Sequence, residues 1–295
     1  MTNRRSRLRG IIDQYGVRLI LGEVPRFYYG NDAGLFENYR AHRDLRRLQA
    51  ATDGRDVQTD ARAEFLRREG YLLLGKPYET ALLATIHEKF QRLVIDPVAS
   101  RPIGPRLREA IRGILNPLER IPELQDLLSP EISRLIRSYY GAHLRVVHVR
   151  LWRNLPVPPE YARQDVYSNL WHNDHDPVTL LRLFVYFSDG VTRETGATHF
   201  HPIPATRKII RLGYLRRRAI LPPARRLLED KREICYFEGD IGSACLFNPQ
   251  LCLHRAGVPR PGSHRDMVQF TIAPADRPLS AGWARELPAD PDLPS

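Results

Sequence analysis

The sequence predicts a mainly β fold with helical additions, in which a two-sheet antiparallel roll occupies the second half of the chain. Two observations support this prediction. Before residue 143 the apolar residues recur at helical spacing, whereas after it they form short extended runs rich in β-branched and aromatic residues. Turn signals such as Ser188-Asp-Gly190 and Gly239-Asp240 separate these runs, as is typical of the short strands of a roll.

The first half is expected to be mainly helical, because apolar residues recur there at intervals of three and four with charges between them. Ser129 followed by Pro130 indicates a capped helix start, and the prolines at 105 and 117 bound another helical stretch. The helices are expected at 35–51, 60–68, 78–95, 107–115 and 129–140. The run 71–74 between two glycines is expected to be a brief strand.

The second half is expected to hold short strands and one insertion. The strands are expected at 143–152, 179–187, 195–203, 241–247 and 268–272. The stretch 204–232 is too long and too basic for a hairpin loop, so it is interpreted as a helical insertion that Pro222-Pro223 divides.

Composition narrows the class of protein. In 295 residues no apolar run approaches the length of a membrane span, and the basic start is not followed by an apolar signal core. The three cysteines, Cys235, Cys245 and Cys252, lack CxxC spacing. This argues for reduced thiols in a cytoplasmic setting and against a disulfide framework or a structural zinc site.

The formal net charge of +11 is concentrated in the first eighteen residues and in 207–232, which contains ten Lys or Arg residues. Such charge is typical of a solvated surface, of a site for an anionic, phosphorylated or carrier-linked substrate, or of a nucleic-acid interface. Tyr214 is the only aromatic residue in 207–232, which disfavours the nucleic-acid interpretation. Nothing in the sequence indicates a protein partner.

The motif His172-Asn-Asp174 carries the chemistry that we expect. On an extended strand, residues two apart point to the same side, so one imidazole and one carboxylate reach a single ion. A mixed histidine and carboxylate set suits non-haem Fe(II), which must keep positions open. His254, 82 residues later, is the expected third ligand, and Arg265 follows it by eleven residues.

Other polar residues near the motif are weaker candidates. His175 cannot begin a second His-x-Asp pair, because Pro177 lies two residues on, and Asp176 lies too far along a strand from His172 to share its ion. His199 and His201 form a His-x-His pair that could belong to a cupin-type metal set, but no arginine follows at a useful spacing.

The second half resembles the Fe(II)/2-oxoglutarate-dependent dioxygenases, and in particular the phytanoyl-CoA dioxygenase-like family. The matching features are Trp-His-x-Asp at 171–174, Gly196-Ala-Thr, Gly239-Asp240, and His254 with its later arginine. "FLRREGYLLL" at 65–74 resembles the opening of that family. The resemblance implies a double-stranded β-helix (jelly-roll, cupin-like) core.

On this reading the chain divides into three parts. They are an N-terminal helical extension over 1–64, the dioxygenase domain over 65–274 with its basic insertion at 204–232, and a proline-rich tail over 275–295.

The resemblance also implies the cofactors and the roles of residues. Fe(II) would be held by His172, Asp174 and His254, with 2-oxoglutarate and O2 at the remaining positions. The residues expected to contact 2-oxoglutarate are Arg265, Arg150, Asn154 and Thr198. Substrate-side candidates are Trp171, His175, Asp176 and His199.

In one respect the chain departs from the family. Ala256 stands where many members carry a hydroxyl residue, so one hydrogen bond to the co-substrate must come from elsewhere.

The implied activity is hydroxylation, or another oxidation, of an unactivated C–H of a small organic substrate, with release of succinate and CO2. Asp174 leaves no room for a bound halide, which disfavours halogenation. Two alternatives stay open: a metal-binding cupin-like protein of another activity, such as an isomerase, and a basic nucleic-acid-binding protein. The first predicts no dependence on 2-oxoglutarate, and the second predicts steeply salt-dependent binding to polynucleotide.

Overall fold

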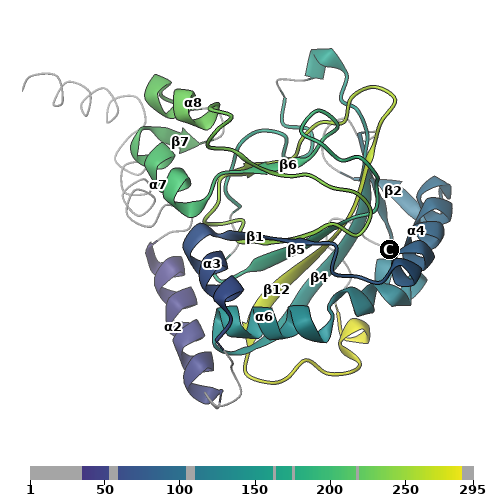
Figure 1. Cartoon of the computed structure of the whole chain (residues 1–295), viewed down its shortest axis with the longest axis horizontal. Helices are drawn as coiled ribbons and strands as arrows, with labels where there is room; N and C mark the ends of the chain where they lie inside the picture. Colours follow the sequence, from purple (N-terminus) through teal and green to yellow (C-terminus); the bar gives the residue numbers. More distant parts are fainter. Residues whose placement is uncertain are drawn as a thin grey trace, which may run out of the picture.

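The computed structural model describes residues 35–52, 59–103, 110–161, 164–174, 177–216 and 219–287. Within these ranges a large antiparallel sheet and a small one face each other, and helices cover the outer side of the large sheet (Figure 1). The predicted two-sheet antiparallel roll is therefore confirmed. The basic N-terminus and the end of the proline-rich tail lie outside the described residues.

The large sheet has seven strands in the order β1-β10-β5-β12-β4-β3-β2, and all neighbouring pairs are antiparallel. Its strands are β1 (Tyr71–Gly75), β2 (Ser100–Pro102), β3 (Ile111–Ile114), β4 (His143–Asn154), β5 (Leu181–Tyr186), β10 (Ala244–Phe247) and β12 (Arg265–Ala275). The small sheet is ordered β11-β6-β9. Its strands are β6 (Thr198–Phe200), β9 (Cys235–Phe237) and β11 (His254–Arg255).

Side chains alternate along β12 between the two faces of the large sheet. Val268, Phe270 and Ile272 belong to the main apolar cluster, together with residues of the covering helices. Arg265, Met267 and Gln269 point to the other side and line a cavity between the sheets. This strand therefore has an apolar outer row under the helices and an inner row that faces the cavity.

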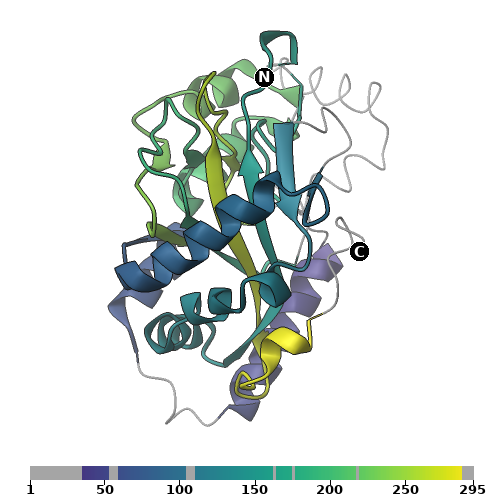
Figure 2. The same cartoon turned by 90° about the vertical axis from the view of Figure 1, so that its right-hand side faces the viewer.

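The covering helices come mainly from the first half of the chain, and α4 crosses the outer side of the large sheet (Figure 2). The helices of that half are α2 (Leu35–Ala51), α3 (Ala61–Glu69), α4 (Thr80–Ile95), α5 (Pro117–Arg120), η3 (Pro122–Leu127) and α6 (Pro130–Tyr140). The expected start of α6 is confirmed, because the Ser129 side chain accepts a hydrogen bond from the Ile132 N–H. In the second half η4 (Pro159–Tyr161) and η5 (Trp283–Arg285) are single turns.

One predicted helix is wrong. The part of 107–115 that the structure describes contains the strand β3, which pairs with β4 on one side and β2 on the other. A nine-residue stretch forms a weak helix by itself, and here the exposed edge of β4 supplies hydrogen-bond partners that favour the extended form.

The stretch 204–232, predicted as a helical insertion, contains two helices, and a hairpin lies between them. It contains α7 (Ile203–Arg211), the two-stranded hairpin β7 (Tyr214–Arg216) and β8 (Ala219–Ile220), and α8 (Pro222–Leu228). Helix α7 begins one residue before the predicted insertion and shortens the predicted strand 195–203 to β6. Among the described residues, no helix is long and apolar enough to cross a membrane.

Candidate metal centre

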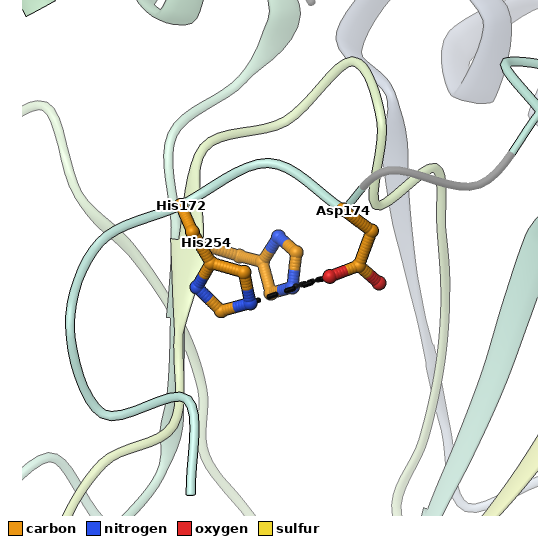
Figure 3. Close-up of side chains that lie close together, drawn as sticks. All are labelled: His172, Asp174 and His254. Carbon is orange, nitrogen blue, oxygen red and sulfur yellow. Dashed lines mark ion pairs between the residues drawn. The ribbon is translucent and has the colours of Figure 1, made fainter. Parts of the chain in front are cut away.

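His172, Asp174 and His254 come together at the inner side of the small sheet. Each offers one ligand atom, and these three atoms lie within 4.8 Å of one another. Asp174 Oδ1 is 3.3 Å from His172 Nε2 and 3.6 Å from His254 Nε2, so all three face a common point (Figure 3). The predicted convergence of these residues is therefore observed.

The main chain holds the motif in place, although not as a continuous strand. His172 forms an isolated bridge with His254, and residues 173 and 174 have no regular secondary structure. Asp174 N–H donates to Pro249 O at 3.0 Å, and the Asn173 amide donates to Gln250 O at 2.9 Å. The expected extended strand at 172–174 is wrong. Residue 172 forms a single bridge with His254, and residues 173 and 174 bond to the loop that precedes β11 instead of to a neighbouring strand.

Both imidazoles are held in the tautomer that a metal requires. His172 Nδ1 lies 2.8 Å from Leu170 O, and His254 Nδ1 lies 3.1 Å from Cys252 O. A carbonyl oxygen only accepts, so each Nδ1 carries the proton and each Nε2 keeps its lone pair toward the common point.

The local electrostatics favour an ionised acid and a neutral histidine. Burial alone would raise the pKa of Asp174, but the charge of Arg182, with contacts to His254 and His172, outweighs it and holds this pKa below its ordinary value. Burial, reinforced by His172, lowers the pKa of His254 to about 3. Deprotonated ligands are what a divalent metal needs.

Arg182 is a member of the site that the sequence analysis did not identify. Its Nη2 lies 2.6 Å from Asp174 Oδ2, and the two groups form an ion pair. Their geometry is not that of a linear hydrogen bond. Arg182 occupies β5, inside a run of apolar residues. A single arginine within an apolar strand is a sequence signal for an ion pair, because a buried charge needs a partner.

A cavity of about 330 Å³ opens in front of the ligand atoms. Apolar and polar side chains of both sheets line it, among them Trp152, Phe184, Met267, Arg150, Asn154, Thr198 and Gln269. Asp165, Tyr167 and Ser168 contribute from the loop that precedes the metal motif. Sequence reasoning missed these three because nothing local relates that loop to the site.

Arg265 is buried, with a side chain only 1% exposed. Its guanidinium donates to Gly196 O, to Asn154 Oδ1 at 2.7 Å and to Thr198 Oγ1 at 3.4 Å. All three acceptors are neutral, its Nε has no hydrogen-bond partner, and no acid in the described part of the chain forms an ion pair with it. A buried guanidinium in this state is a site for an anion.

The structure places the other predicted co-substrate residues around the same cavity. Asn154 and Thr198 both contact Arg265. Arg150 lines the cavity four residues before Asn154 on β4, where it pairs with Gln269. Four residues of strand span about 13 Å, so Arg150 lies toward the opposite end from Arg265.

Two substrate-side candidates lie away from the cavity. Trp171 packs with α7 and α8 residues and under the Arg255 guanidinium, which is 4.9 Å from its ring. His199 contacts Trp171 and Tyr236 on the same side of the small sheet. Their neighbours His172 and Thr198 face the cavity, so alternation turns these two outward. His175 and Asp176 lie outside the described residues.

Comparison with known proteins gave results at the level of structure alone. No family model matches the chain, and no curated protein matches its sequence. Solved structures do match. EctD from S. alaskensis, solved with 2-oxoglutarate and 5-hydroxyectoine, is 17% identical with a TM-score of 0.56, over 81% of this chain and 87% of its own.

Two enzymes of nogalamycin biosynthesis are similar to the same extent. The non-haem α-ketoglutarate-dependent carbocyclase SnoK is 17% identical with a TM-score of 0.52, over 83% of this chain and 96% of its own. The epimerase SnoN, solved with Fe3+, α-ketoglutarate and nogalamycin RO, is 17% identical with a TM-score of 0.51, over 83% and 90% of the two chains. The expected jelly-roll fold is confirmed, and the chain carries a His-x-Asp…His triad within it.

Proposed function

We propose that this protein is an Fe(II)/2-oxoglutarate-dependent oxygenase acting on a small organic molecule. One observation carries the proposal: a His-Asp-His ligand set shares a cavity with a buried guanidinium that contacts only neutral oxygens among the described residues. A buried cation without an acid costs free energy, which supports a carboxylate of the co-substrate as the partner of Arg265.

The residues present fit the metal. His172 Nε2, His254 Nε2 and Asp174 Oδ1 would hold Fe(II), since two neutral imidazoles and one carboxylate on one side of the ion leave the opposite positions open. The backbone carbonyls of Leu170 and Cys252 fix the orientations of the two rings.

The residues present also fit the co-substrate. Arg265 would bind the far carboxylate of 2-oxoglutarate, because a guanidinium pairs with a carboxylate through two hydrogen bonds. Thr198 contacts Arg265 at 3.4 Å and supplies a hydroxyl at this end of the cavity, which compensates for Ala256. We retain Arg150 as a candidate for the metal-proximal carboxylate.

The proposed reaction is hydroxylation of an unactivated C–H bond. When bound, iron and 2-oxoglutarate supply the activation of O2, with release of succinate and CO2. The chain itself orients the co-substrate through Arg265 and excludes water with Trp152, Phe184 and Met267, which line the cavity. The formal net charge of +11 favours a substrate with an anionic group.

An anaerobic titration tests the proposal. Fe(II) and then 2-oxoglutarate are added to the purified protein, and the visible charge-transfer band of the chelate is followed. We expect the band to appear and to saturate at one equivalent, and air with substrate to yield succinate and a product that has gained one oxygen atom. A folded, iron-loaded sample without the band would contradict the proposal and favour a cupin-like protein of another activity.

A further inference from the structure

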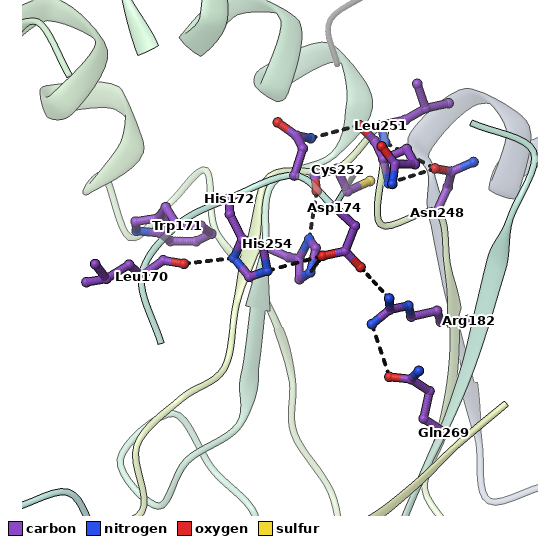
Figure 4. A network of polar contacts seen from close by, with 12 residues as sticks. Leu170, Trp171, His172, Asp174, Arg182, Asn248, Leu251, Cys252, His254 and Gln269 are labelled. Carbon is purple, nitrogen blue, oxygen red and sulfur yellow. Dashed lines mark hydrogen bonds and ion pairs between the residues drawn. The ribbon is translucent and has the colours of Figure 1, made fainter. Parts of the chain in front are cut away.

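The two carboxylate oxygens of Asp174 have different partners. Oδ1 faces the two histidine Nε2 atoms at 3.3 and 3.6 Å, whereas Oδ2 faces the Arg182 guanidinium at 2.6 Å (Figure 4). Both side chains of this ion pair are largely buried, with 19% of Arg182 and 14% of Asp174 exposed. One oxygen of the carboxylate therefore faces the metal ligands, and the other faces a cation.

Arg182 is itself held by the sheet. Its Nη1 donates to Gln269 Oε1 at 3.1 Å, and Gln269 Nε2 donates to Thr271 Oγ1 at 3.1 Å. His148 Nε2 lies 3.0 Å from Thr271 Oγ1 and 3.4 Å from Gln269 Nε2. These residues come from β5, β12 and β4, and Thr271 is paired with Arg182 on one side and His148 on the other. The position of the Arg182 guanidinium is therefore fixed by residues of three hydrogen-bonded strands.

We propose that Arg182 is a positioning residue that keeps Asp174 a one-oxygen metal ligand. A carboxylate near a divalent ion binds through one oxygen or two, and the second oxygen would occupy a position that a chelating co-substrate needs. With Oδ2 engaged by Arg182, only Oδ1 turns to the ion, and three positions stay open. This inference rests on the proposed function for the identity of the co-substrate.

The charge of Arg182 acts in the same direction as its geometry. Paired with Asp174, it reduces the negative charge that the ligand set presents to an incoming dicarboxylate. Loss of the guanidinium would leave Oδ2 in a largely buried place without its cation, so the carboxylate would turn both oxygens toward the metal. The predicted consequence is weaker chelation of 2-oxoglutarate with metal binding preserved.

The test compares Arg182→Met and Arg182→Lys with the wild type, all as full chains. Arg193→Met is the matched control, because Arg193 forms an ion pair with Glu238 outside the cavity lining. Fe(II) affinity is measured first under anaerobic conditions, and 2-oxoglutarate affinity is then measured from the charge-transfer band. We expect R182M to lose at least roughly tenfold more in 2-oxoglutarate affinity than in Fe(II) affinity, a difference of about 1.4 kcal/mol. Its metal affinity should change far less, and R182K should recover part of the loss.

A second measurement does not depend on 2-oxoglutarate. Crystals of the wild type and of R182M soaked with Mn(II) alone should show Asp174 binding through one oxygen in the first and two in the second. Equal loss of metal and 2-oxoglutarate affinity, or one-oxygen binding in R182M, would overturn the inference. Failure of the wild type to form the band would instead count against the proposed function, and the Mn(II) structures would still decide the role of Arg182. Should R182M fail to fold, Gln269→Leu, which frees the guanidinium from β12, replaces it in both measurements.

Discussion

The main chains of His172 and His254 bond to each other in both directions, with His172 N–H donating to His254 O at 2.9 Å and His254 N–H donating to His172 O at 2.8 Å. Their rings lie side by side, with centroids 4.2 Å apart. One backbone bridge therefore fixes the separation of two metal ligands that are 82 positions apart in the chain. The fold itself thus sets the positions of these two ligands.

Removal of any one ligand should abolish tight metal binding. We expect His172→Ala, His254→Ala and Asp174→Ala each to weaken Fe(II) binding by more than the roughly 10- to 100-fold typical of outer-shell changes. Anaerobic equilibrium dialysis measures this, with His143→Ala on β4 as the control outside the cavity. Full metal occupancy in any of the three variants would remove that residue from the ligand set.

Arg265→Met should separate co-substrate binding from metal binding. Loss of one partner from a buried charge pair costs about 2–5 kcal/mol, so we expect 2-oxoglutarate affinity to fall by at least roughly 30-fold. Fe(II) affinity should be retained, because Arg265 contacts none of the three ligands. Titration of each variant with metal and then co-substrate distinguishes the two effects.

Arg265→Met should not destabilise the apo protein. Arg265 is buried and forms no ion pair among the described residues, so its replacement by an apolar side chain of similar length removes a cost of folding. We expect the apo form of Arg265→Met to unfold at the same temperature as the wild type or higher. A large fall in Tm would mean that the guanidinium is stabilised by its neutral acceptors.

Asp266 should contribute strongly to the free energy of unfolding. Its buried carboxylate contacts Arg153 through two distances of 2.7 Å and accepts from Gln91 at 3.0 Å, on the side of β12 opposite to the cavity. Asp266→Ala leaves a largely buried guanidinium without its partner, which costs about 3–5 kcal/mol. Urea denaturation of the apo protein at neutral pH measures this loss.

The pH dependence of that loss follows from the ionisation of Asp266. Burial would raise its pKa, but hydrogen bonds from Arg153 and His264 prevail and lower it from 3.8. The folded state thus favours the charged form, so its stabilisation is complete above the unfolded pKa and disappears as pH falls through the folded one. The difference between wild type and Asp266→Ala should therefore shrink in acid.

His199 should make the protein less stable in mild acid. Burial, with the nearby charges of Arg255 and Arg265, lowers its pKa to about 3. Below pH 6.5 the unfolded chain binds a proton at this residue that the folded chain does not, so stability falls with decreasing pH until about 3. The slope from one such group is at most about 1.4 kcal/mol per pH unit. Denaturation of His199→Phe between pH 8 and 5 should show a shallower decline than the wild type.

The elements that followed from sequence are those whose signals are local. The cap at Ser129 and the helical spacing over 35–51 act within a few residues, and they predicted α6 and α2. The run 268–272 likewise predicted the position of β12. The stretch 111–114 was misread because its strand depends on the neighbouring β4, which lies more than thirty residues later. Tertiary hydrogen bonds overrode the local helical pattern there.

For the site, the sequence determined the chemistry: two histidines, one acid and one arginine at spacings that suit iron and a dicarboxylate. The surroundings of each of these groups depend on contacts between distant parts of the folded chain. The tertiary structure turned Trp171 and His199 away from the cavity and brought Arg182 against Asp174. It also left Arg265 without an acid among the residues that the structure describes. The physical reason is that ligand chemistry belongs to a residue type, whereas burial, charge pairing and direction belong to surroundings that distant strands create.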